Sequence, residues 1–166
     1  MDFIEFLKVN QTEKIDIRLF NPLSQEELYN AEKMLNVKMP LVLSKILLFS
    51  NGAIMGPFTI LGINNKKIGN ILNLNDGLIN GENQNLFFSG SEHIDFSYNV
   101  DNQMIYKQDY SEIAPELIPI AKNFDDFFSS VATKISYIVD NDLSDEIYTF
   151  EDEELPENLR KWPMSY

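Results

Sequence analysis

The sequence contains no cysteine and only one histidine among its 166 residues. Without cysteine there can be no disulfide, no thiolate nucleophile and no cysteine-ligated zinc. The one histidine, His93, stands beside Glu92 and near Asp95, but a lone histidine between two expected strands is typical of an exposed turn residue. The sequence also has no Gly-x-Ser-x-Gly motif, no phosphate-binding loop and no Gly-x-Gly-x-x-Gly fingerprint. We therefore expect no catalytic residues, no cofactor and no metal, in a protein that is not an enzyme.

Basic residues are scarce. The chain has 13 Lys+Arg against 26 Asp+Glu, which gives a formal net charge of −13. A field of this sign repels phosphate backbones, so nucleic-acid binding is not expected. The same field attracts a basic protein and speeds the encounter with it. Acidity that serves only solubility is common, however, so charge alone does not identify a partner.

Long apolar runs are missing as well. No run approaches the ~20 residues that a membrane helix needs. The first residues, Met1 to Glu5, carry acids where a signal peptide needs a basic start. We therefore expect a cytoplasmic protein that does not enter a membrane. Its length suits one domain over residues 1–166, in which the acidic C-terminal segment 140–166 is either docked or partly flexible.

Several helices are indicated by apolar periodicity and by capping residues. Ser24 and Glu27 have the spacing of a capping box. Pro40 suits the first turn of a helix that is apolar nearly all round and should be buried. Asn123 can cap a last helix, where Asp125 lies near the positive end of the helix dipole. These signals predict helices over residues 25–35, 41–50 and 124–138, and a shorter one over 2–8.

The middle of the chain is typical of β-structure. Alternating apolar residues and turn signals predict strands or extended segments over residues 14–20, 57–63, 86–89, 94–100 and 103–107. Residues 64–82 are rich in Asn and Gly, which predicts a loop with a short helical piece at 68–74. The order of elements predicts an α+β domain. Its central antiparallel sheet is flanked by two N-terminal helices and one closing C-terminal helix.

A set of short motifs follows the same order along the chain. They are Leu35-Asn36-Val37-Lys38-Met39-Pro40 between two helices, Ser50-Asn51-Gly52 at a helix end, Phe58-Thr59-Ile60-Leu61-Gly62 in a strand, and Ala121-Lys122-Asn123-Phe124-Asp125-Asp126-Phe127 at the last helix. Together, over residues 23–138, they resemble the SUKH superfamily. That superfamily contains the Smi/Knr-type fungal cell-wall regulators and many bacterial immunity proteins.

The resemblance implies a SUKH-like fold and a binding role, and it brings no catalytic residues. Bacterial members are antidotes to secreted polymorphic toxins, many of them nucleases, which are basic where they meet phosphate. The first hypothesis is therefore an immunity protein that occludes the active surface of a cognate basic toxin. The alternative is a non-catalytic regulatory or scaffold adaptor of the Smi/Knr type. A third hypothesis is an enzyme that uses scattered carboxylates, with calcium.

Negative charge is densest near the C-terminus, and this segment is the predicted partner-binding site. Such a run is commonly only a solvated face. As an interaction site, it would attract Lys and Arg, and the neighbouring Tyr148, Phe150 and Trp162 would be either core residues or anchors. The predicted partner-binding residues are Asp140, Asp142, Asp145, Glu146, Glu151, Asp152, Glu153 and Glu154.

The same segment has part of a calcium-loop pattern. Asp140, Asp142, Ser144 and Glu151 have the spacing of positions 1, 3, 5 and 12. The sixth position, which needs glycine for its sharp turn, is Asp145, and no convincing helix follows. We therefore interpret the segment as solvated and acidic rather than as a calcium site.

Overall fold

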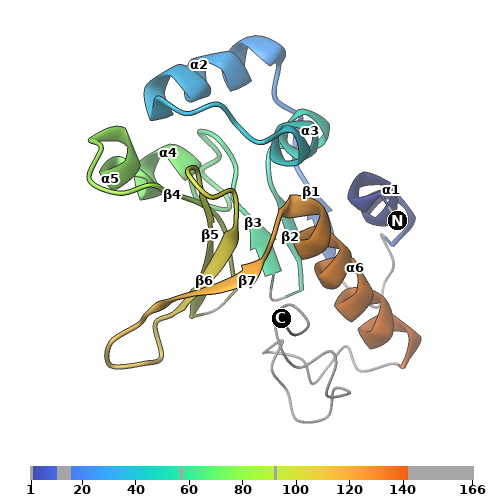
Figure 1. Cartoon of the computed structure of the whole chain (residues 1–166). Helices are drawn as coiled ribbons and strands as arrows, with labels where there is room; N and C mark the ends of the chain where they lie inside the picture. The colour runs from blue at the N-terminus through green and yellow to red at the C-terminus, as the bar shows by residue number, and fades with distance from the viewer. Residues whose placement is uncertain (1, 11–15, 57, 92, 142–166) are drawn as a thin grey trace.

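The described part of the chain folds into one antiparallel sheet, and several helices connect its strands along the chain (Figure 1). The computed structural model describes residues 2–10, 16–56, 58–91 and 93–141. The strands are β1 (Ile17–Leu19), β2 (Ala53–Met55), β3 (Phe58–Ile60), β4 (Asn85–Ser91), β5 (Ile94–Asn99), β6 (Ile105–Asp109) and β7 (Leu117–Ala121). The helices are α1 (Phe3–Val9), α2 (Gln25–Leu35), α3 (Leu41–Phe49), α4 (Ile71–Leu74), α5 (Asp76–Ile79) and α6 (Phe124–Asp140). The predicted α+β class is confirmed.

The strand register sorts the side chains of the sheet onto two faces. Leu86 pairs with Tyr98, and Tyr98 pairs with Ile105. Directly paired residues share a face, so these three lie on the same side. The Tyr98 ring lies 5.1 Å from the ring of Phe124, which places α6 against that side. Leu86 and Ile105 are fully buried there.

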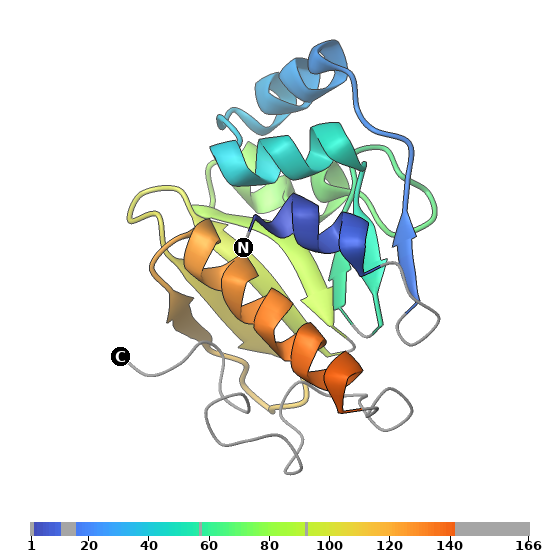
Figure 2. The ribbon, with the colours of Figure 1, turned by 90° about the vertical axis from the view of Figure 1, so that its right-hand side faces the viewer.

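Aromatic rings join α6 and α1 to this face. The centroids of Phe88 and Phe124 are 4.9 Å apart, and Phe3 of α1 stacks on Phe128 of α6 at 4.4 Å. Figure 2 shows the two helices lying across the same side of the sheet. Each buried ring contributes ~1.5–3 kcal/mol. The expected closing helix is therefore the element that completes the core.

The start of α2 is the predicted capping box. The backbone N–H of Glu27 donates to the Ser24 hydroxyl at 3.2 Å, and the Ser24 N–H donates to the Glu27 carboxylate at 2.8 Å. This backbone hydrogen bond, with the one from the Ser24 hydroxyl, lowers the pKa of Glu27. The helix ends at Asn36, whose φ of 53° is left-handed. Both ends of α2 are thus set by local sequence.

The Ser-Asn-Gly motif ties the end of α3 to the sheet. The Asn51 side chain accepts the N–H of Ile63 at 2.7 Å and donates to the Ile63 carbonyl at 2.9 Å. Gly52 has a φ of 90°, and a Cβ there would lie 2.7 Å from the carbonyl oxygen of Ile60. A side chain is therefore excluded at this position by backbone conformation and by space.

Two strands of the sheet were not expected from the sequence. β2 has only three residues and follows Gly52 directly, so the alternation of its apolar residues is too short to predict a strand. β7 contains Pro119, which normally argues against a strand, but among the described residues β7 pairs only with β6 and lies at an edge of the sheet. The hairpin strand expected over 103–107 lies instead at 105–109, because Gln103 adopts a φ of 62° in the turn.

The Asn-rich stretch between β3 and β4 is more ordered than the predicted loop. It contains α4 and α5, which meet at Asn75. The Asn75 amide is 1% exposed and donates to the carbonyls of Ile71 and Phe87 at 2.7 and 2.9 Å. Its oxygen accepts the N–H of Phe87 at 2.8 Å. One buried amide therefore fixes both helices to β4, next to the irregularity after Phe87.

Candidate protein-binding site

The predicted acidic site lies almost wholly outside the described residues. Asp140 is the last residue of α6 and is exposed. The other predicted residues, and the rest of the partial calcium pattern, fall within 142–166, which the structure does not describe. The acidic partner-binding site therefore stays a prediction.

Metal-binding and membrane-spanning features can be assessed in the described ranges. There, no group of three or more His, Asp or Glu side chains could hold a metal ion. His93 lies in a turn, with its Nε2 3.7 Å from a carboxylate oxygen of Asp109. Burial opposes ionisation of Asp109, but hydrogen bonds from Ser111 and the charges of His93 and Lys107 outweigh it and lower its pKa.

No helix among residues 2–10, 16–56, 58–91 and 93–141 is long and apolar enough to cross a membrane.

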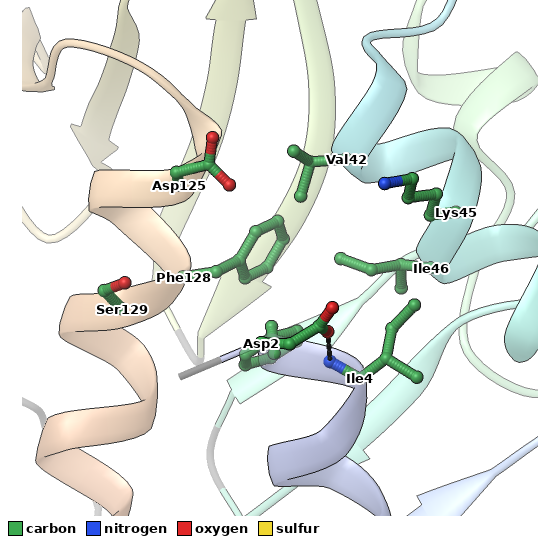
Figure 3. A pocket seen from close by; sticks show the side chains of 9 residues that line it. Asp2, Ile4, Val42, Lys45, Ile46, Asp125, Phe128 and Ser129 are labelled. Carbon is green, nitrogen blue, oxygen red and sulfur yellow. Dashed lines mark hydrogen bonds between the residues drawn. The ribbon is translucent and has the colours of Figure 1, made fainter.

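A small pocket opens where α1, α3 and α6 meet (Figure 3). Its volume is about 110 Å³. The three helices lie far apart in the sequence, and each contributes a few side chains to the pocket lining. The lining residues are Asp2, Phe3, Ile4, Val42, Lys45, Ile46, Asp125, Phe128 and Ser129.

The floor of the pocket is apolar. Phe3, Ile46 and Phe128 are 6%, 1% and 1% exposed, so they belong to the core. The stacked rings of Phe3 and Phe128 hold α1 against α6. The floor is therefore rigid, because moving it would disturb the core packing.

The rim of the pocket carries charges of both signs. Asp2 caps α1 by accepting the N–H of Ile4 at 2.8 Å. Asp125 lies in the first turn of α6, and Lys45 projects from α3 on the opposite side of the pocket (Figure 3). The side chains of Asp125 and Lys45 make no hydrogen bond or ion pair with another described residue. Both are exposed and available to a partner.

The shallow hollow beside Asn51 is a weaker candidate. It is lined by Leu19, Phe20, Asn21, Asn51, Asn64, Asn65, Lys66 and Lys67. The Asn51 amide is bound to Ile63, and the Asn65 amide donates to the Asn51 carbonyl at 2.7 Å. These groups hold the loop together, which accounts for them without a ligand.

An apolar surface lies at the β6–β7 hairpin, which extends away from the helices (Figure 1). Ile113 at its tip is fully exposed, and Tyr110 is 52% exposed. Leu117 and Ile118 on β7 are also exposed. Because successive strand residues point to opposite faces, the hairpin exposes apolar side chains on both of its faces.

Sequence reasoning did not find the pocket. The helix dipole accounts for Asp125 in the sequence, and no sequence motif indicates a binding role for Asp2 or Lys45. Nothing in the local sequence shows that residues 2–4, 42–46 and 125–129 meet. The packing of Phe3 on Phe128 joins α1 to α6, and α3 contacts α6 as well.

The structure defines an α+β domain in which α1 and α6 pack on one face of an antiparallel meander. The chain belongs to the SMI1 / KNR4 family (SUKH-1), whose sequence profile matches residues 22–162. The match confirms the resemblance seen in the motifs. It covers every element from α2 to α6, whereas α1 and β1 precede it. No curated protein matches the chain significantly.

Proposed function

We propose that this protein is an immunity protein that binds a cognate basic toxin, such as a nuclease, and blocks its active surface. Membership of the SUKH-1 family is the observation that carries the proposal. The net charge of −13 supports it, because a strongly acidic protein is complementary to a surface built to hold phosphate. Residues 1–166 act as one domain in the cytoplasm, without a catalytic step and without nucleic acid as a partner.

The proposed mechanism is occlusion. Long-range attraction raises the association rate, and short-range fit keeps the complex together. The acidic residues from Asp140 to Glu154 supply much of the attraction in this proposal. Apolar and aromatic contacts then exclude the substrate of the toxin from its groove.

The test is co-expression with a candidate toxin domain encoded by a neighbouring gene. Cells that produce the toxin domain alone should stop growing, and cells that produce both proteins should survive. The two proteins should also co-elute in size-exclusion chromatography. Growth arrest despite good expression of both, with no complex, would contradict the proposal.

An adaptor role is the second candidate. It is favoured by the family description, SMI1 / KNR4 family (SUKH-1), because that name refers to Smi/Knr-type proteins. The exposed apolar hairpin around Ile113 gives such an adaptor a contact surface separate from the pocket. Recovery of several signalling or wall-synthesis proteins with the tagged chain, in place of one toxin, would support this candidate.

A further inference from the structure

We propose that the pocket between α1, α3 and α6 is an anchor site for one basic side chain of the protein partner, arginine in preference to lysine. The aliphatic stem packs on the floor formed by Ile46 and Phe128, and the cationic head lies between Asp2 and Asp125. This inference rests on the proposed binding of a basic protein.

The size of the pocket selects a single side chain. Its volume of about 110 Å³ is well below the roughly 300–1,000 Å³ of pockets that hold drug-sized ligands. The buried floor is apolar and rigid, which suits a methylene stem. A large cofactor or metabolite does not fit, whereas one side chain from a docked surface does.

The charges of the rim select a cation. Two carboxylates face one ammonium, and Lys45 lies across the pocket from Asp125 (Figure 3). A guanidinium presents several donors to these carboxylates, and it is less strongly hydrated than an ammonium. Lys45 repels that head and keeps it on the α1–α6 side. Arginine is also enriched at the energetic centres of interfaces.

A purely structural role explains Asp2 better than Asp125. Asp2 caps α1 through one carboxylate oxygen. The start of α6, however, is already capped, because the Asp126 N–H donates to the Asn123 side chain at 2.8 Å. Asp125 is therefore not needed for capping, and its side chain has no hydrogen-bond or ion-pair partner among the residues that the structure describes.

One wall of the pocket lies outside the part of the chain that matches the family. α1 supplies Asp2, Phe3 and Ile4, and it lies outside the residues 22–162 that match the family. The N-terminal helix thus adds the wall that closes the pocket.

The test is an amide NMR titration of the full chain with N-acetyl-arginine amide as the probe. N-acetyl-norleucine amide and N-acetyl-glutamate amide are the matched controls. Saturable shifts are expected at residues 2–4, 42–46 and 125–129, with millimolar affinity for the arginine probe and weaker binding of both controls.

Variants that remove either the negative or the positive charges of the rim test the charge preference of the pocket. The double variant Asp2→Asn, Asp125→Asn should bind the arginine probe roughly tenfold more weakly, because hydrogen bonds to charged groups are the strong ones. Asparagine is as good a helix cap as aspartate, so α1 should keep its start. Lys45→Gln should bind the probe at least as tightly as the unmodified protein.

The proposal is overturned by any of three results. These are no saturable shift at the pocket, equal binding of the glutamate probe, or undiminished binding by the double asparagine variant. Toxin co-expression gives a separate answer. Rescue and complex formation without probe binding would reject the anchor site alone, and probe binding without rescue would reject the immunity function alone.

Discussion

Asn75 should be among the most costly polar residues to replace in this fold. Replacing it with alanine removes two hydrogen bonds to the Ile71 and Phe87 carbonyls and one from the Phe87 N–H. The amide is 1% exposed, so water does not readily replace these bonds. Each bond contributes about 1 kcal/mol net, and a buried group left unpaired costs about 1–3 kcal/mol. We expect Asn75→Ala to lower the free energy of unfolding by about 3 kcal/mol.

Urea denaturation followed by circular dichroism measures this loss directly. At this chain length, a loss of about 3 kcal/mol lowers Tm by roughly 6–12 °C. The matched control is Asn73→Ala, which removes an exposed amide whose oxygen accepts from the Asn70 side chain at 3.2 Å. This control should change stability by less than about 0.5 kcal/mol. If the two variants are equally stable, Asn75 does not hold α4 and α5 on the sheet.

Three further outcomes are expected. Gly52→Ala should cost about 2–5 kcal/mol in urea denaturation, since it combines left-handed strain with the approach to the Ile60 carbonyl, whereas Gly81→Ala, with open space around it, should cost only about 1–2 kcal/mol. The pKa of Glu27 is lowered in the folded state, so its stabilisation is present above the unfolded pKa and is lost as pH falls through the folded pKa. The difference in unfolding free energy between the unmodified protein and Glu27→Gln should therefore disappear in strongly acidic buffer. A difference that stays constant with pH would refute this. Reversing the charges of residues 151–154 should slow association with the toxin and flatten its salt dependence in stopped-flow measurements; an unchanged rate at low salt would exclude this run as the attracting surface.

The elements that sequence predicts well are those with strong local signals. The capping box at Ser24 and Glu27 gives the start of α2, because both partners lie within one turn. The repeat of apolar residues in α6 predicts which face of the helix is buried, because the helix is long enough to show a helical period. In both cases the sequence within the element carries the information.

The elements that sequence misses depend on distant partners. β2 is a strand because β1 and β3 pair with its three residues, and β7 tolerates Pro119 because only one of its edges is paired. Asn75 resembles the other asparagines around it until its contacts with Phe87 are known. The pocket likewise exists only after α1, α3 and α6 have packed.

The order of strands in the sheet has a consequence during synthesis. Each strand pairs with the one before it, so most of the sheet can form as the chain lengthens. Its apolar face, however, receives Phe124, Phe127 and Phe128 only when α6 emerges. A ribosome must therefore synthesise the chain through α6 before the phenylalanines on this face are shielded from water, and any partner that needs the finished surface must wait for that moment.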